Sequence, residues 1–165
     1  MIRKMTVEDI QDVQQIALTS WQHTFQEHIP EEVIEVFIER TYSDLMLKKQ
    51  LEKTMVLLAI DDQGKSIGYL SYTPIDVDGE SELTALHMLP EYLNSGHEEA
   101  LLKEALGTLQ EAVNIDVYVD QNDMALQDFY AKQGFRFVES FPELFEGIAV
   151  NTLHYSLPIT QPAHT

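Results

Sequence analysis

The spacing of apolar residues along the first fifty positions predicts a short strand followed by two helices. Residues 2–5 form a brief strand-like run, and Thr6 suits the N-cap of a helix with acidic residues in its first turn. Over residues 10–25 apolar side chains recur every three or four positions, which is the period of a helix with one buried face. Pro30 suits the start of a second helix, whose apolar stripe extends with a further turn or two over residues 31–51.

After residue 54 the pattern changes to that of strands. Apolar runs separated by turn sequences rich in Asp and Gly predict three antiparallel strands. A helix, a buried strand, a short helix stopped by Gly134 and two final strands follow. The predicted strands are 55–60, 66–73, 82–88, 115–119, 135–141 and 151–157, and the helices between them are 124–133 and one with an apolar face at Ala100, Leu102, Ala105, Leu106, Leu109 and Val113.

This order of elements predicts an α/β fold. We expect a single mixed, mostly antiparallel twisted sheet flanked by helices on both faces. The length of 165 residues suits one domain, placed at residues 1–158, with a C-terminal tail at 159–165 that has no core-forming pattern.

The charge is strongly acidic, with 28 Asp and Glu against 10 Lys and Arg and a formal net charge of −18. Such a field repels nucleic acid and acidic membrane surfaces and favours a cationic ligand, although an acidic surface also serves solubility alone. Cysteine is absent, which excludes disulfides and thiolate chemistry, and no metal site is expected. We found no signal peptide or transmembrane pattern, so a cytoplasmic location is expected.

The turn before the helix that follows residue 88 is a candidate anion site. The first N–H groups of a helix are unpaired and lie at the positive end of its dipole. Glu98 and Glu99, however, place two carboxylates in the first turn. Ser95 and Glu98 also have the spacing of a capping box, in which each side chain accepts the backbone N–H of the other, so the helix would satisfy its own donors.

Two segments resemble the GNAT superfamily of acyl-CoA-dependent N-acyltransferases. Residues 122–135, NDMALQDFYAKQGF, are similar to the family's N-x-x-A-x-x-F-Y-x-x-x-G-F segment, and residues 86–92, LHMLPEY, are similar to its strand and exit turn before the CoA loop. The resemblance covers residues 2–158. Residues 25–51 are more weakly similar to the polyamine-acetylating branch.

The resemblance implies acetyl-CoA as cofactor and attack of an amine on the thioester carbonyl. Tyr130 is then the acid for the departing thiolate, Asn122 contacts the cofactor arm, and a backbone N–H near Met88 polarises the carbonyl. Tyr130 also suits a packing role, and Asn122 a turn or cap. The implied cofactor-binding residues are Leu86, His87, Met88, Leu93, Asn94, Ser95, Gly96, His97, Glu98, Asn122 and Tyr130.

The base for the ammonium proton is Glu82 or His87. Many relatives carry a glutamate at the position of Thr84, and Glu82 lies two residues earlier, on the same face of a regular strand. We therefore place Glu82 with Tyr130 among the catalytic residues. His87 is expected on the opposite face, where a structural role is the simpler interpretation.

The pyrophosphate loop departs from the family pattern Q/R-x-x-G-x-G/A. That frame falls on residues 93–98, where Leu93 replaces the polar residue and Glu98 the last small one. A carboxylate about 5 Å from a phosphate, at an effective dielectric of about 20, costs about 3 kcal/mol.

Two functions follow from these departures. The first is an acetyl-CoA-dependent N-acetyltransferase for a small cationic amine, polyamine or basic peptide. The alternative is a catalytically impaired binding or regulatory module with the same fold, a degenerate cofactor loop and weakened or lost acetyl-CoA binding. A homodimer is considered as the assembly, and the sequence leaves open whether the first two helices form a lid.

Overall fold

The computed structural model describes residues 1–159; residues 160–165, the rest of the predicted tail, lie outside the described residues. The described chain forms one seven-stranded sheet with the strand order β1-β2-β3-β4-β5-β7-β6. Its strands are β1 (Ile2–Lys4), β2 (Met55–Ile60), β3 (Ser66–Tyr72), β4 (Glu80–Met88), β5 (Asn114–Asp120), β6 (Arg136–Phe145) and β7 (Ile148–Pro158). Its α-helices are α1 (Ile10–Phe25), α2 (Glu31–Thr41), α3 (Asp44–Lys53), α4 (His97–Thr108) and α5 (Met124–Lys132).

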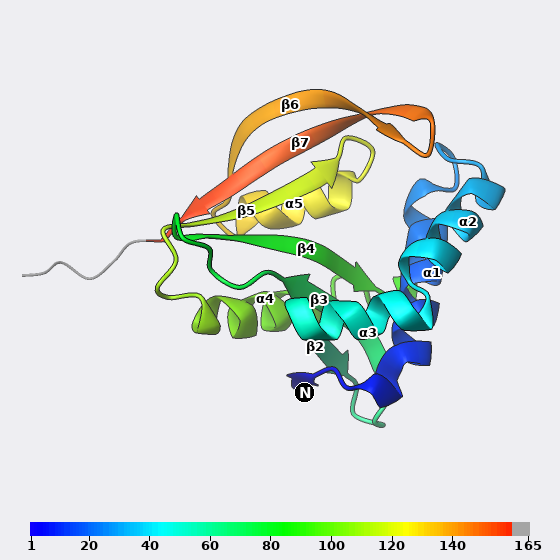
Figure 1. Cartoon of the computed structure of the whole chain (residues 1–165), viewed down its shortest axis with the longest axis horizontal. Helices are drawn as coiled ribbons and strands as arrows, with labels where there is room; N and C mark the ends of the chain where they lie inside the picture. The colour runs from blue at the N-terminus through cyan, green and yellow to red at the C-terminus, as the bar shows by residue number, and fades with distance from the viewer. Residues whose placement is uncertain (160–165) are drawn as a thin grey trace, which may run out of the picture.

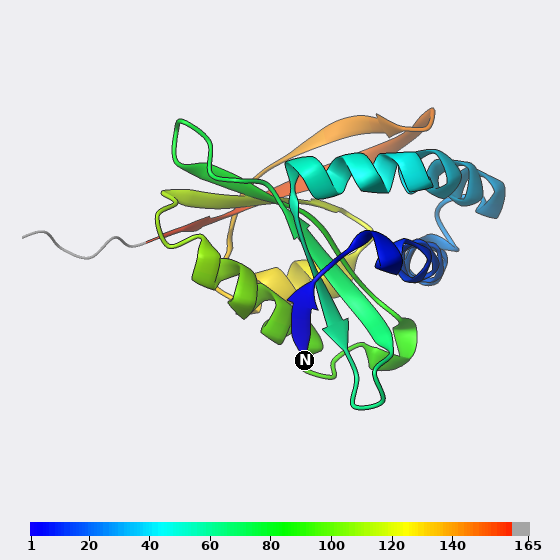
Figure 2. The same ribbon diagram turned by 60° about the horizontal axis from the view of Figure 1, so that its bottom comes forward.

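The helices lie in two layers, with α1, α2 and α3 on one face of the sheet and α4 and α5 on the other (Figures 1 and 2). The hydroxyl of Ser20 in α1 lies 2.9 Å from Nδ1 of His87 in β4. On the opposite face, the hydroxyls of Tyr72 in β3 and Thr108 in α4 lie 2.7 Å apart. The predicted α/β class, with helices on both faces of a mixed, mostly antiparallel sheet, is confirmed.

The N-terminal cap forms at the predicted residue. Thr6 and Asp9 make a capping box around a short 3₁₀ turn, Val7–Asp9, that leads into α1. The Asp9 carboxylate also accepts two hydrogen bonds of 2.8 Å from the guanidinium of Arg3 in β1. These donors lower the pKa of Asp9 to about 2, with the Arg3 hydrogen bond as the largest cause. The pair ties the first strand to the first helix.

Several predicted boundaries differ from the structure, most of all at α3, α4 and the last hairpin. Residues after Tyr42 form a separate helix, α3, because the Ser43 side chain accepts the N–H of Met46 and starts a new cap. The helix α4 ends at Thr108, so its buried face is Leu101, Leu102 and Ala105, with Leu109 just after it, while Ala100 and Val113 are exposed. The last two strands are longer than predicted and form a hairpin that turns at residues 146–147.

An irregularity in β4 changes which side chains share a face. Tyr72 of β3 pairs with Leu83 while its neighbour Ser71 pairs with Ala85, so Thr84 is an additional residue in β4. This is a β-bulge, which interrupts the alternation of side chains along a strand. The hydroxyl of Thr84 lies 2.6 Å from the hydroxyl of Ser71.

The centre of the sheet is open at one end. The strands β4 and β5 are parallel and pair only from Glu80–Asn114 to Leu83–Val117. Beyond that point β4 continues to Met88 and β5 to Asp120, and within residues 1–159 no strand pairs with β4 on this side. The two strands therefore diverge and leave a gap in the sheet.

Candidate active site

The main cleft lies where β4 and β5 diverge. It has a volume of about 440 Å³ and is bordered by the end of α1, the end of β4, the loop before α4, the first turn of α4 and the whole of α5. It thus reaches both faces of the sheet through the gap. The lining residues are Ser20, His23, Thr24, Leu86, His87, Met88, Leu93, Asn94, Glu98, Glu99, Asn122, Asp123, Met124, Ala125, Leu126, Asp128, Phe129, Lys132 and Gln133.

The edge of β4 that faces the gap presents backbone hydrogen-bonding groups. The N–H of Leu89 donates to the carbonyl of Ile67 in β3 at 2.8 Å. Because successive N–H groups of a strand point to opposite edges, those of Leu86 and Met88 point away from β3 and toward the gap. An extended ligand with amide groups can pair with this edge as an added strand would.

Most predicted cofactor residues are brought together in this cleft. Leu86, His87 and Met88 come from the end of β4, Leu93, Asn94 and Glu98 from the loop and helix start, and Asn122 from the turn before α5. Three others, Ser95, Gly96 and His97, lie in the same loop but do not line the cleft. Tyr130 is buried and does not line it.

The predicted capping box between Ser95 and Glu98 is wrong. Gly96, with φ of 90°, is the N-cap of α4, and no side chain of the described residues caps this helix. Asn94 also has a positive φ, 63°, so the loop turns twice before the helix begins. Ser95 is thereby placed outside the first turn, and its hydroxyl lies 2.7 Å from Nδ1 of His97 instead.

Glu98 nevertheless occupies the helix start. Its Oε1 atom is buried and has no hydrogen-bond partner among residues 1–159. Burial raises the pKa of Glu98, and the backbone N–H groups of Asn94 and of Glu98 itself act in the opposite direction. The carboxylate therefore competes with any anion for the same donors, in a place where an unpartnered oxygen is costly.

Tyr130 is only 1% exposed and packs against Phe129 and Phe135, with ring centroids 5.3 and 5.0 Å away. Burial is the largest cause that raises its pKa, and the charge of Asp123 adds to it. Tyr130 therefore stays protonated at neutral pH, as a proton donor must. Asn122 is exposed in the turn before α5, where the Asp123 side chain caps the helix through the N–H of Leu126.

The two candidate bases lie on the same face of the sheet. The prediction that His87 points away from the face of Glu82 is wrong, because the bulge at Thr84 adds one residue between them. Leu83 pairs with Tyr72 and faces α4, so its neighbour Glu82 faces α1; His87 also faces α1, since it contacts Ser20.

Burial makes these two bases unequal. It lowers the pKa of His87 to about 4, which leaves a neutral and weakly basic ring at neutral pH. Glu82 is partly buried, and its pKa is raised first by burial and then by the charge of Asp116, while His154 lowers it.

A second group on this face was not identified from the sequence. Nε2 of His154 in β7 lies 2.8 Å from Oδ1 of Asp116 in β5, and the two side chains are 17% and 13% exposed. The ring of Tyr118 stacks on His154, with centroids 4.5 Å apart and planes at 18°. Asp116 is the cross-strand partner of Glu82. The alternation of polar residues in both strands hints at this face, but the pairing requires the strand register.

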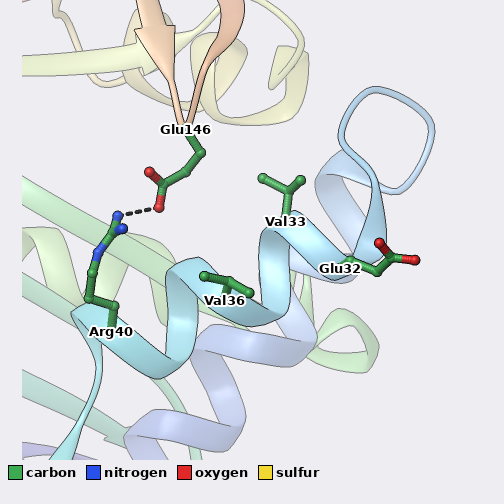
Figure 3. A pocket seen from close by; sticks show the side chains of 5 residues that line it. All are labelled: Glu32, Val33, Val36, Arg40 and Glu146. Carbon is green, nitrogen blue, oxygen red and sulfur yellow. Dashed lines mark hydrogen bonds and ion pairs between the residues drawn. The ribbon is translucent and has the colours of Figure 1, made fainter.

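The β6–β7 hairpin arches from β5 across to α2 (Figure 1). At its tip Phe145 stacks on Trp21 of α1, with centroids 5.2 Å apart, and Glu146 forms an ion pair with Arg40 of α2. Figure 3 shows Arg40 pointing toward Glu146 beside a smaller pocket of about 310 Å³, which Val33, Val36 and Glu32 also line. The hairpin thus closes one side of the α1 face.

Several lining residues were missed as site residues. Ser20, His23 and Thr24 belong to α1, whose sequence shows only the helical stripe, and their position depends on the tertiary fold. The lining residues of α5 lie within the quoted segment 122–135, so the signal was present without individual roles. Among residues 1–159, no group of three or more His, Cys, Asp or Glu is placed to hold a metal ion, and no helix is long and apolar enough to cross a membrane.

Comparison with known proteins places this cleft in a family. Residues 25–156 match the acetyltransferase (GNAT) domain family. The spermidine N(1)-acetyltransferase of Thermoplasma acidophilum is 27% identical over 142 residues, covering 82% of this chain and 87% of that protein. An uncharacterised N-acetyltransferase of Bacillus subtilis, YuaI, is 30% identical over 104 residues, and the match covers 61% of this chain and 59% of that protein.

Solved structures agree with the sequence comparisons. The crystal structure of PaiA N-acetyltransferase from Thermoplasma acidophilum in complex with coenzyme A has a TM-score of 0.82 at 25% identity, covering 93% of this chain and 96% of that one. The ribosomal-protein-S18-alanine N-acetyltransferase of Escherichia coli, at 15% identity and a TM-score of 0.74 over 99% of this chain and 96% of that one, shares the fold. The chain belongs to the GNAT family of acetyltransferases.

Proposed function

We propose that the protein is an acetyl-CoA-dependent N-acetyltransferase that acts on a small cationic amine or polyamine. The observation that carries the proposal is the gap between β4 and β5, where unpaired N–H groups of β4 line a cleft of about 440 Å³. In this proposal the pantetheine arm pairs with the β4 edge, and the N–H of Met88 donates to the thioester carbonyl. The edge of β4 is thus suited to bind the extended pantetheine arm of acetyl-CoA.

The choice of a cationic acceptor rests on the charge of the α1 face. Glu82 and Asp116 are neighbours there, and the whole chain carries a formal net charge of −18. Such a field concentrates cations and repels anions. The similarity to a spermidine acetyltransferase, at 27% identity, supports a polyamine among the cations.

Two residues are assigned to the chemistry. Tyr130, which is protonated at neutral pH and whose pKa burial raises further, is proposed to protonate the thiolate as the C–S bond breaks. Glu82 is proposed to contact the ammonium group of the acceptor on the α1 face. Tyr130 is a core residue beside Phe129, which lines the cleft.

One observation favours the second candidate function, a binding or regulatory module with weakened or lost cofactor binding. The buried, unpartnered Oε1 of Glu98, noted above for residues 1–159, lies at the start of α4, where the pyrophosphate is expected. An impaired enzyme would keep the fold and the acidic face but would bind acetyl-CoA poorly.

A turnover assay separates the two candidates. Purified protein is mixed with acetyl-CoA and, in turn, spermidine, a lysine-containing basic peptide and glutamate, and release of the CoA thiol is followed. The enzyme candidate requires thiol release and an acetylated product with spermidine or the peptide, and none with glutamate. Binding of spermidine without turnover at millimolar acetyl-CoA would contradict it and favour the module.

A further inference from the structure

The proposed reaction needs a group that takes a proton from the acceptor. At neutral pH an alkyl amine is an ammonium ion, and its nitrogen has no lone pair for attack on the thioester. Thr84 of β4 offers only a hydroxyl, which is hydrogen-bonded to the hydroxyl of Ser71. His87 is weakly basic because it is buried. Within β4 this leaves Glu82, and beyond it the groups of the neighbouring strands that lie on the same face.

The Asp116–His154 pair has the geometry of an oriented base. Asp116 holds Nε2 of His154 at 2.8 Å, and stacking on Tyr118 fixes the plane of the ring. In the described part of the chain Nδ1 of His154 makes no hydrogen bond. When Nε2–H donates to the carboxylate, the lone pair of Nδ1 remains available. A carboxylate that orients a histidine in this way is a recurring device of proton transfer.

The position of the pair in the sheet suits the proposed acceptor site. Tyr118, the cross-strand partner of His154, is the residue of β5 that follows Val117, where the β4–β5 pairing ends. Tyr118 is 44% exposed, so the face is open to solvent. The pair and Glu82 thus share the α1 face at the base of the gap.

We propose that His154, oriented by Asp116, accepts the ammonium proton, while Glu82 holds the ammonium group. The inference rests on the proposed acetyltransferase function and names the proton acceptor within that site. The groups that face His154 are Glu82 from β4, Asp116 and Tyr118 from β5, and Glu139, its cross-strand partner in β6. His154 is the catalytic residue of this set, and Asp116 positions it.

The protons of the step balance. The N–H bond of the ammonium breaks and the proton bonds to Nδ1 of neutral His154, which leaves a lone pair on the amine nitrogen. That lone pair forms the C–N bond at the thioester carbonyl, and collapse of the adduct breaks the C–S bond. The nitrogen loses two protons in all. One reaches solvent through His154, and the other balances the proton that Tyr130 gives to the CoA thiolate, so the net reaction releases one proton.

The pH dependence of turnover tests the inference. Initial rates with acetyl-CoA and spermidine are measured from pH 6 to 9 for the unmodified protein and for His154→Gln, Asp116→Asn and Glu82→Gln, with His28→Gln as the control because His28 is an exposed loop histidine. Thermal unfolding and acetyl-CoA affinity are measured alongside. The unmodified protein and the control should reach a plateau of kcat/KM within this range, because a side-chain base takes the proton from the ammonium ion.

Each variant has its own expected result. His154→Gln should lower kcat/KM by about 10²–10³ at pH 7. Its kcat/KM should then rise tenfold per pH unit without a plateau, because only the free amine reacts. Asp116→Asn should lose less, since an amide oxygen can still accept the hydrogen bond from Nε2 but carries no charge to offset the one that the ring gains. Glu82→Gln should raise KM for spermidine and keep the plateau. Free imidazole should restore part of the rate of His154→Ala.

Three outcomes overturn the inference. A plateau that persists in His154→Gln, with kcat within twofold of the control, excludes this residue as the base. A plateau lost in Glu82→Gln and kept in His154→Gln assigns the proton to Glu82 instead. Absence of turnover by the unmodified protein with any amine overturns the proposed function, and the inference falls with it; in the first two outcomes the proposed function stands.

Discussion

Removal of the Glu98 charge is expected to strengthen acetyl-CoA binding and to stabilise the fold slightly. Glu98 lines the cleft at the start of α4, and no other group of residues 1–159 satisfies its buried Oε1. A carboxylate about 5 Å from a phosphate charge, at an effective dielectric of about 20, costs about 3 kcal/mol. We therefore expect Glu98→Gln to lower the Kd for acetyl-CoA by up to about two decades.

The stability of the same variant should also rise slightly. The raised pKa means that the folded protein disfavours the ionised carboxylate, and this cost outweighs the stabilisation of about 0.3–1 kcal/mol that a negative charge in the first turn of a helix contributes through the dipole. Glu104→Gln is the matched control, because Glu104 is exposed on the same helix and does not line the cleft. Calorimetric titration with acetyl-CoA and urea unfolding of both variants measure the two effects separately.

The pH dependence gives a second measurement on Glu98. Because burial raises its pKa, Glu98 becomes neutral at a higher pH than an ordinary glutamate. Its repulsion of phosphate should therefore weaken as the pH is lowered from neutral. Acetyl-CoA binding should therefore strengthen more between pH 7 and pH 5 in the unmodified protein than in Glu98→Gln. The variant serves as the control, because protonation of the cofactor itself affects both proteins equally. Micromolar binding by the unmodified protein, unchanged in Glu98→Gln at both pH values, would refute the reasoning.

The remaining predictions concern the proposed acid, a glycine of β3 that packs against β4, and the N-terminal cap. Tyr130→Phe should lower kcat by about 10²-fold with acetyl-CoA affinity nearly unchanged in titration, whereas a packing role alone would leave kcat intact. Gly68→Ala should destabilise the fold by about 1–3 kcal/mol in urea, since a Cβ there would lie 2.1 Å from the sulfur of Met88, while Gly107→Ala, with nothing within 4 Å, should stabilise it by up to about 1 kcal/mol. Asp9→Asn should cost about 2 kcal/mol near pH 7, and this difference should shrink as the pH falls from about 4 to about 2, because a lowered pKa stabilises the fold only above that range.

Local signals in the sequence were sufficient for the order of elements. The strand and helix periods, the cap at Thr6 and the turn glycines each act over a few residues, so they predict elements without knowledge of the fold. The boundaries failed where the signal was weak or ambiguous. Ser43 starts a helix that the continuous apolar stripe concealed. The tip of the last hairpin, residues 142–150, is largely exposed, so its sequence does not show the regular alternation of a strand.

Site residues were predicted only where the family pattern could be matched to individual positions of this sequence. Asn122 and the end of β4 line the cleft because the family pattern fixes their place relative to the gap. The carboxylate of Glu98 at the helix start was also foreseen, but its capping partner was not, since the positive φ values of Asn94 and Gly96 rotate Ser95 out of the first turn. Such backbone turns are set by the whole loop and leave no simple spacing in the sequence.

The bulge at Thr84 links the failed prediction for His87 to the proposed base. An additional residue in β4 can be recognised only from its pairing with β3. The adjacent residues Ser71 and Tyr72 of β3 pair with Ala85 and Leu83, so Thr84 has no partner residue in β3. The bulge orients Thr84 so that its hydroxyl pairs with Ser71, and the nearest carboxylate of β4 is then Glu82, beside Asp116. Base chemistry on this face therefore depends on residues of β5 and β7, which approach β4 only through the sheet register. There Asp116 holds one ring nitrogen of His154, and the other makes no hydrogen bond among the described residues.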